Sequence, residues 1–286
     1  MAEHNGFLAI DIGGTKLATA IVARDGAVVA RSQAPTPKTD VWATLSSLIS
    51  QQLSSAPLAV SSVGVGCGGP MELGGEHVSP LNIQDWRNFP LRRQVSELTQ
   101  LPVFIANDAQ AIVLGESWCG AAQGRSDVLG MVVSTGVGGG ILSRGNLVVG
   151  RLGNAGHIGH INVQPDGRLC ACGARGCLEA YASGPSIANI TGAPAEAASP
   201  ETVLATGRYV GRAIASAAAM LDFDLVVIGG SVALGFGEPF FAAVQQEVEQ
   251  SARLDFVRGV RVMPVGLGAD SPLVGAAAVA RMATIV

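Results

Sequence analysis

The sequence is poor in charged and in aromatic side chains. Charged residues make up 14% and aromatic residues 5% of the 286 positions, whereas 48% are hydrophobic. This balance is typical of a well-buried globular protein and excludes a disordered chain. The formal net charge of −4 leaves no broad basic surface. We therefore expect no nucleic acid among the partners, because nonspecific binding to phosphates needs such a surface.

Signals for export and membrane insertion are also missing. No basic segment followed by an apolar stretch opens the chain, so we predict no signal peptide. The most apolar stretches, such as 214–220 and 273–283, are too short to span a bilayer. Cys67 and Cys119 lie far apart, which fits a reducing compartment better than a disulfide framework. We predict a cytoplasmic protein with no membrane partner.

The other three cysteines lie within eight residues of one another, and a histidine stands ten residues upstream of the first. Three thiolates and one imidazole form a closed tetrahedral set for Zn2+, and closed sets are normally structural. The alternative is that the cysteines are buried as small apolar side chains, but their glycine-rich flanks favour a metal loop. The predicted ligands are His160, Cys170, Cys172 and Cys177.

This zinc loop, residues 156–179, also contains His157 and ends at Glu179. A metal that fixes the segment would fix these two polar side chains as well. We therefore expect them to form a rigid recognition surface.

Hydrophobic periodicity predicts alternating strands and helices, which indicates an α/β fold. Strands are predicted at 7–11, 16–23, 27–32, 58–65, 102–106, 128–134, 141–143, 225–228 and 260–265. Helices are predicted at 42–53, 107–118, 179–190, 201–221, 239–252 and 272–282.

A strand–glycine turn–strand pattern occurs twice, as AIDIGGTKLATAI and VVSTGVGGGIL. This weak repeat predicts two related domains that face each other across a cleft. We expect a smaller N-terminal α/β domain from residues 1–112 and 272–286, because the closing helix can pack back on it. Residues 113–271, with the zinc loop, would form the larger domain.

The first glycine turn reads DIGGTK, residues 11–16. Glycines let backbone amides approach an anion closely, and a carboxylate at a strand end can hold Mg2+. The alternative is an ordinary hairpin that needs glycine for a positive φ. The segment is not a P-loop, because the pattern G-x-x-x-x-G-K-[ST] is absent.

Two further glycine turns follow buried strands. The segment STGVGGG at 134–140 carries no charge, and we predict a turn over 135–140. The segment IGGS at 228–231 precedes a helix, which suits a nucleotide. Short hairpin and strand–helix loops are the alternatives. Together with the first turn, they point to binding of one polyphosphate.

Three polar residues complete the candidates. Asp108 starts a helix after Asn107, so it is either an N-cap or a carboxylate that accepts a proton from a substrate hydroxyl. Asn82, in a loop before Asp85, is suited to a sugar hydroxyl or is simply a turn former. Glu116, two turns into the helix, is interpreted as a solvated residue.

Taken together, DIGGTK, GVGCGGP, NDAQA, STGVGGGIL, GHIGH, CACGARGCLEAYASG and VVIGGS resemble the ROK family of repressors and sugar kinases. The resemblance covers nearly the whole chain in the right order. It implies an actin-like, hexokinase-type (ribonuclease H-like) fold of two domains that bind sugar and Mg-ATP, and it favours a homodimer. Because the first strand begins near Phe7, we expect no helix-turn-helix of the repressor branch.

The resemblance also implies roles for single residues. Asp108 would be the general base, and the predicted zinc ligands keep that role. ATP, phosphate and Mg2+ would be bound by Asp11, Gly13, Gly14, Thr15, Lys16, Thr135, Gly136, Gly138, Gly229 and Gly230. The sugar would be bound by Gly68, Gly69, Asn82, Asn107, Asp108, His157, His160 and Glu179.

One position departs from most sugar kinases of the family, which have Glu where this chain has His157. Members that phosphorylate N-acetylmannosamine resemble this chain there. A histidine can donate to an acetamido carbonyl, whereas a carboxylate can only accept. We therefore expect ATP-dependent phosphorylation of the 6-hydroxyl of an aldohexose, with N-acetylmannosamine favoured. A glucokinase and a non-catalytic sugar sensor are the alternatives.

Overall fold

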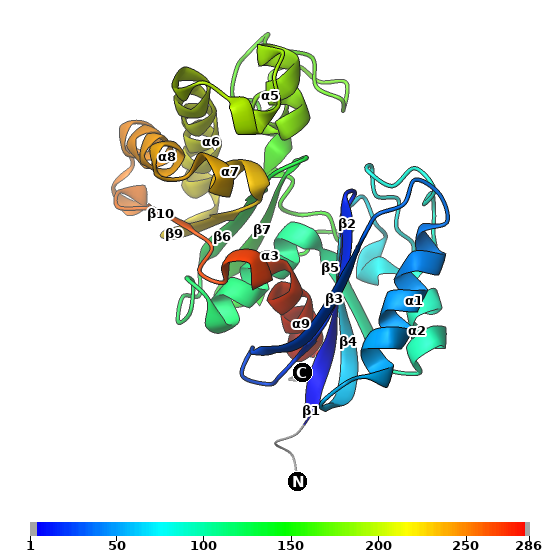
Figure 1. Ribbon diagram of the computed structural model, residues 1–286. Helices are drawn as coiled ribbons and strands as arrows, with labels where there is room; N and C mark the ends of the chain where they lie inside the picture. Colours follow the sequence, from blue (N-terminus) through cyan, green and yellow to red (C-terminus); the bar gives the residue numbers. More distant parts are fainter. Residues whose placement is uncertain (1–4, 284–286) are drawn as a thin grey trace. The chain divides into compact units, whose positions relative to one another are not determined.

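The computed structural model describes residues 5–283, and the chain falls into two compact units (Figure 1). Within the described range, the first unit contains residues 5–123, 149–155 and 269–283, and the second contains 124–148 and 156–268. These limits differ from the predicted boundaries after residues 112 and 271. The difference arises because α3 (Asp108–Cys119) runs unbroken past residue 112 and packs on α9 (Ser271–Ala283) in the first unit.

The first unit is built on one mixed sheet with the strand order β3-β2-β1-β4-β5. Its strands are β1 (Asn5–Ile12), β2 (Lys16–Val22), β3 (Val28–Pro35), β4 (Ala59–Cys67) and β5 (Val103–Asn107). Its other helices are α1 (Val41–Ser54) and α2 (Leu91–Thr99). Because β1, β4 and β5 are parallel, their carboxyl ends meet at one edge of the sheet.

Helices cover both faces of this sheet (Figure 1). Successive side chains of a strand point to opposite faces. Accordingly, Leu8 and Ile10 pack with α1 and α2, whereas Phe7 and Ala9 pack with α9. The helix α9 approaches β4 so closely that a Cβ on Gly64 would overlap the α9 backbone. The small side chains along α9 are therefore required by this contact.

Glu116 is fully buried in the first unit, so its interpretation as a solvated residue is wrong. Its carboxylate accepts hydrogen bonds from the Ala121 N–H (2.8 Å) and the Ser271 hydroxyl (2.9 Å). Burial of a charged group is tolerated only where such partners are present. Glu116 thus fastens the end of α3 to the start of α9, and apolar periodicity alone does not reveal this role.

The second unit contains a mixed sheet with the order β10-β9-β6-β7-β8. Its strands are β6 (Val128–Val133), β7 (Val137–Ser143), β8 (Asn146–Leu147), β9 (Leu225–Gly229) and β10 (Arg261–Pro264). Its helices are α4 (Glu179–Ala182), α5 (Gly184–Thr191), α6 (Pro200–Leu221), α7 (Ser231–Phe236) and α8 (Glu238–Ser251). Across residues 5–283, short 3-10 turns lie at Leu73–Gly75, Ile158–His160, Ala195–Ala197, Asp255–Val257 and Gly268–Asp270.

Two predicted elements of the second unit differ from the structure. The helix predicted at 179–190 is two helices, because Ser183 has an extended backbone and caps α5 by accepting a hydrogen bond from the Ser186 N–H. The glycine turn predicted at 135–140 ends earlier, since β7 already begins at Val137 and pairs with β6. Gly138 therefore lies in a strand and not in the turn.

One large core holds this unit together. Leu129 and Met131 of β6 pack in the same cluster as Ile214 of α6 and Phe240 of α8. Among residues 5–283, no helix is both long and apolar enough to cross a membrane.

Candidate functional site

The carboxyl edge of the first unit's sheet brings predicted site residues together. In the strand register, Ile12 lies beside Cys67, and Cys67 lies beside Asn107. A Cβ built on Gly66 would lie 4.0 Å from Asp11 Oδ1 and 3.9 Å from the Asp108 Cα. Asp11 and Asp108, which are distant in the sequence, are therefore neighbours. In open α/β sheets, ligands bind outside the carboxyl ends of the strands.

This pair of carboxylates creates a locally negative site. Burial first, and then the charge of Asp108, raise the pKa of Asp11 to about 7, although Lys16 opposes the shift. Burial, Asp108 and Asp11 in turn raise the pKa of the Cys67 thiol far above its ordinary value, so Cys67 stays neutral. Oxygen ligands of this kind suit a divalent cation, which would offset the mutual repulsion.

The first glycine turn is exposed and well supported. The Gly13 N–H donates to Lys16 O (3.0 Å), and the Thr36 hydroxyl donates to Gly13 O (2.7 Å). Neither Gly13 nor Gly14 has a positive φ, so the hairpin alternative does not explain these glycines. A Cβ on Gly14 would lie 2.5 Å from the Asn82 Cβ. Gly14 is therefore needed for the close approach of the Asn82 loop.

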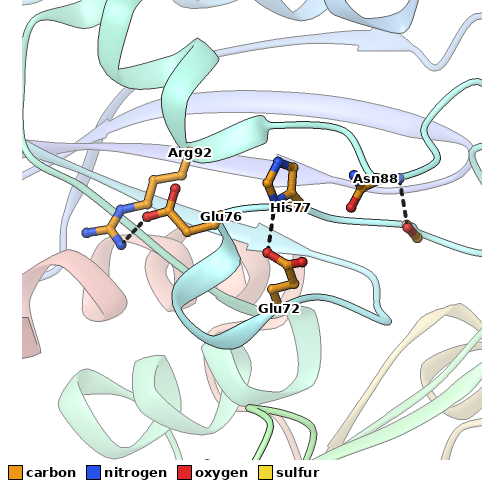
Figure 2. A network of polar contacts seen from close by, with 6 residues as sticks. Glu72, Glu76, His77, Asn88 and Arg92 are labelled. Carbon is orange, nitrogen blue, oxygen red and sulfur yellow. Dashed lines mark hydrogen bonds and ion pairs between the residues drawn. The ribbon is translucent and has the colours of Figure 1, made fainter.

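The loop that carries Asn82 is braced by polar contacts (Figure 2). His77 contacts Glu72 (2.8 Å), Arg92 pairs with Glu76 (2.9 Å), and the Asn88 N–H donates to the Ser79 hydroxyl (2.9 Å). These contacts are exposed, so each contributes little stability.

Aromatic packing adds a firmer support to the same loop. Buried Trp86 stacks on Phe89 with ring centroids 4.3 Å apart, and Arg87 donates to three loop carbonyls. Gly69 O accepts from the Leu81 N–H (3.3 Å), and a Cβ on Gly68 would lie 3.9 Å from Pro80. Gly68 and Gly69 thus contact the residues just before Asn82.

At the start of α3, the N-cap is Asn107 and Asp108 is the first helical residue. Asn107 Oδ1 and Asp108 Oδ1 both accept from the Ala109 N–H, at 3.2 and 2.7 Å. The cap alternative for Asp108 is therefore wrong, because Asn107 performs that role.

Gln110 is a site residue that the sequence prediction missed. Its side chain accepts from the Asn107 N–H (3.3 Å) and donates to the carbonyls of Gly153 (3.4 Å) and Ala155 (3.1 Å). It is buried, and it ties the Asp108 end of α3 to segment 149–155. The Asn-x-x-Gln spacing of a capping box was the available signal.

In the second unit, three chain segments meet around Ser134. The Gly184 N–H donates to Ser134 O (2.8 Å), and the hydroxyls of Ser134 and Ser231 are 2.9 Å apart. A Cβ on Gly230, which has φ 98, would overlap the Val133 backbone. The second and third glycine turns are thus adjacent, as expected for parallel neighbours β6 and β9. Ser134 and Ser231 were predicted only as members of these two turns, and Gly184 was not predicted.

Glu179 lies against the second glycine turn. Its Oε2 accepts a hydrogen bond from the Val137 N–H (2.8 Å), and a Cβ on Gly136 would lie 3.1 Å from the same oxygen. Exposed Thr135 completes the turn. A carboxylate that accepts from a backbone amide makes a strong, charge-assisted bond. The predicted sugar ligand Glu179 therefore also supports the turn.

The four predicted zinc ligands are brought together by the second unit. Their ligand atoms all lie within 4.8 Å of one another. The sulfurs of Cys172 and Cys177 are 3.7 Å apart, and Cys170 Sγ is 3.9 Å from His160 Nδ1. A tetrahedral Zn2+ site requires about 3.8 Å between sulfurs and about 3.6 Å between sulfur and nitrogen.

These residues therefore fit a structural zinc ion. Positive φ values at Gly173 (90°) and Gly176 (79°) give the loop its turns. His157 is exposed, with its ring centroid 6.2 Å from that of His160. The zinc loop thus holds both histidines in neighbouring positions.

Comparisons with known proteins agree with this architecture. The ROK family model matches residues 7–283. An N-acetylmannosamine kinase of Escherichia fergusonii is 37% identical over 263 residues, which covers 85% of this chain and 88% of that protein.

Two solved structures are similar along almost their whole length. A ROK family glucokinase from Streptomyces griseus, in complex with glucose and AMPPNP, has a TM-score of 0.83 and 32% identity over 97% of this chain and 99% of its own. A ROK hexokinase from Thermus thermophilus has a TM-score of 0.85 and 32% identity over 98% and 99%. The fold is therefore the predicted actin-like, hexokinase-type α/β fold. The chain belongs to the ROK family.

Proposed function

We propose that this protein is an ATP-dependent sugar kinase that phosphorylates the 6-hydroxyl of an aldohexose. The observation that carries the proposal is the pair Asp11 and Asp108 at the carboxyl edge of the first sheet. The kinase names of the similar proteins support the same reaction class. A protein that only binds sugar has no need for paired carboxylates and glycine turns.

In this proposal, Asp108 accepts the proton of the 6-hydroxyl while the sugar oxygen attacks the γ-phosphorus. The new phosphorus–oxygen bond forms as the bond to the bridging oxygen of ADP breaks. Asn107 and Gln110 hold the start of α3, and so they keep the Asp108 backbone in place.

Asp11 and the glycine turns handle the phosphates. Mg2+, when bound with ATP, supplies positive charge that stabilises the phosphoryl oxygens. Asp11 would hold this ion directly or through water, with Thr15 and Lys16 beside it. In the second unit, Thr135, Gly136, Gly229 and Gly230 would present backbone amides to the nucleotide.

We propose N-acetylmannosamine as the preferred acceptor, with glucose as the alternative. His157 supports the first, because an imidazole N–H can donate to an acetamido carbonyl. The E. fergusonii relative supports it too. The glucokinase from S. griseus supports the alternative, since it is similar over 97% of this chain.

A coupled ADP-release assay with Mg-ATP and four sugars tests both levels of the proposal. N-acetylmannosamine, glucose, N-acetylglucosamine and mannose are compared at equal concentrations. We expect ADP release to depend on sugar and to be fastest with N-acetylmannosamine. Preference for glucose would keep the kinase but overturn the role of His157. Sugar binding without ADP release would instead favour the sensor.

The cytoplasmic location, expected from the missing export signal and the cysteine pattern, and the homodimer, expected from the family resemblance, stay predictions. Sedimentation of the purified protein would measure the oligomeric state directly.

A further inference from the structure

Val137, the first residue of β7, is contacted from two sides by the zinc loop, residues 156–179. On one side, the Val137 N–H donates to Glu179 Oε2 (2.8 Å). On the other side, Gly159 packs on the Val137 carbonyl so closely that a Cβ there would overlap it. Val137 directly follows the glycine turn 134–136, so these two contacts fix where that turn ends.

Each of these contacts lies next to predicted zinc ligands in the sequence. Gly159 immediately precedes His160, and Glu179 stands two residues after Cys177. His160 and Cys177 thus connect the metal position to opposite sides of Val137 through very short pieces of chain. A displacement of either ligand must therefore move the group that contacts Val137.

These two pieces of chain, which we call the two arms of the zinc loop, are joined by backbone hydrogen bonds. The Leu178 N–H donates to Ile161 O (2.9 Å), and the Val163 N–H donates to Gly176 O (2.8 Å). Cys172, in contrast, is exposed. The apolar core under this region does not cover that residue. Backbone hydrogen bonds such as Cys170 N–H to Ala174 O (2.8 Å) close the turn around Cys172, and coordination would add a direct link from Cys172 to His160.

We propose that metal binding at His160, Cys170, Cys172 and Cys177 positions the glycine turn 134–136 through Gly159 and Glu179, and thereby sets the affinity for nucleotide. The effect on nucleotide affinity rests on the proposed function, whereas the positioning of the turn by the metal does not. Because metal binding is coupled to the folding of its ligand segment, loss of metal should loosen both arms. The metal would then position the glycine turn 134–136 as well as the predicted sugar ligands of the zinc loop.

The test compares Glu179→Ala with Glu179→Gln in the zinc-loaded protein. Both changes remove the negative charge, but Gln keeps an oxygen that can accept from the Val137 N–H. Mg-ADP binding is measured by calorimetry without sugar, together with zinc content and hydrogen exchange of amides 134–138. We expect Glu179→Ala to bind Mg-ADP up to roughly tenfold more weakly than Glu179→Gln, because Ala lacks the one neutral hydrogen-bond acceptor that Gln keeps for the Val137 N–H.

The metal itself is tested by Cys172→Ser and by chelation of the wild-type protein. The matched control is Cys119→Ser, which changes a cysteine of the first unit. We expect zinc loss to raise the exchange rate of the Val137 amide at least tenfold, while Cys119→Ser leaves it unchanged. Chelation of the wild type covers the case in which Cys172→Ser does not fold.

The outcomes separate this inference from the proposed function. If zinc-free protein keeps wild-type exchange at 134–138, the positioning role is wrong, whatever the nucleotide does. If exchange rises but the zinc-loaded wild type binds no Mg-ADP, the positioning role stands and the kinase proposal fails. Equal Mg-ADP affinity with and without zinc would overturn only the claim that metal binding sets the affinity for nucleotide.

Discussion

The two glycine turns have similar sequences but are supported in different ways. Both connect antiparallel strands, β1 to β2 and β6 to β7. The first turn lies beside Asp11 and Lys16 and is braced by Thr36 and the Asn82 loop. The second carries no charge and is braced by Gly159 and Glu179 of the zinc loop. A repeated backbone device can therefore serve different chemistry, because the supporting side chains come from elsewhere in the fold.

The difference is also electrostatic. The first turn belongs to a site of two carboxylates, which is suited to a cation and to proton transfer. The second offers backbone amides, which are suited to anions. Changes at the first turn should therefore affect catalysis and pH dependence, whereas changes at the second should affect nucleotide affinity.

The largest expected effect is a loss of turnover without a loss of sugar binding. Asp108→Asn removes the proposed base but keeps the size of the side chain and its oxygen acceptor. We expect kcat to fall by roughly 10²- to 10⁴-fold, while sugar binding measured by calorimetry changes little. Asp166→Asn is the matched control, because Asp166 is exposed and has φ 56, which Asn tolerates. Near-normal turnover in Asp108→Asn would falsify the assignment of the base.

The next effect concerns the support of the Asp108 end of α3. Gln110→Ala leaves the Asn107 N–H and the carbonyls of Gly153 and Ala155 without their side-chain partner. We expect the free energy of unfolding to fall by about 2–3 kcal/mol and the sugar KM to rise. Denaturant unfolding and steady-state kinetics measure both quantities.

Gln123→Ala is the control for that experiment, since Gln123 is exposed. Equal stability of the two variants would show that the Gln110 hydrogen bonds contribute nothing.

A pair of glycine substitutions compares the turns directly. In Gly14→Ala, the new methyl would lie 2.5 Å from the Asn82 Cβ, so the loop or the turn must shift. In Gly136→Ala, the nearest atom is the Glu179 Oε2 at 3.1 Å, at the end of a flexible side chain. We expect Gly14→Ala to lose about 1–3 kcal/mol of stability and Gly136→Ala to lose less, by denaturant unfolding. A larger loss at Gly136 would contradict this order.

The smallest effect is a pH dependence that belongs to the first turn alone. In the unfolded chain Asp11 has its ordinary pKa of 3.8, and in the folded protein the pKa is about 7. The folded state therefore binds more protons between these values. The stability contributed by protonated Asp11 is full below 3.8 and is lost as the pH rises through about 7.

Asp11→Asn should remove this dependence. In magnesium-free buffer, we expect the wild type to lose about 1 kcal/mol of stability relative to Asp11→Asn as the pH rises from 6 to 7. Thermal unfolding at several pH values measures the difference. Parallel curves for the two proteins would show that Asp11 is ionised throughout.

Much of the site was predictable where chemistry is concentrated in a short segment. The clustered cysteines and His160 indicated a zinc site before any fold was known, and their ligand atoms do lie together. Strands with continuous apolar runs, such as β1 and β9, were also predicted. Helix α2 was missed, because only Leu91 and Val95 of its residues are buried.

Other errors came from contacts between distant segments. Glu116 looked like a surface residue, since its partner Ser271 is 155 positions away. The missed break between α4 and α5 is of another kind, because its signal in Ser183, Gly184 and Pro185 is local.

The sequence by itself determined the family, the zinc ligand set and the order of strands and glycine turns, because these depend on residue type and spacing along the chain. Only the tertiary structure decided which groups meet. It placed Asp11 beside Asp108, Asn82 against Gly14, and Glu179 on the Val137 amide. These contacts depend on strand register and on the packing of segments far apart in the chain, and no local pattern of residues encodes them.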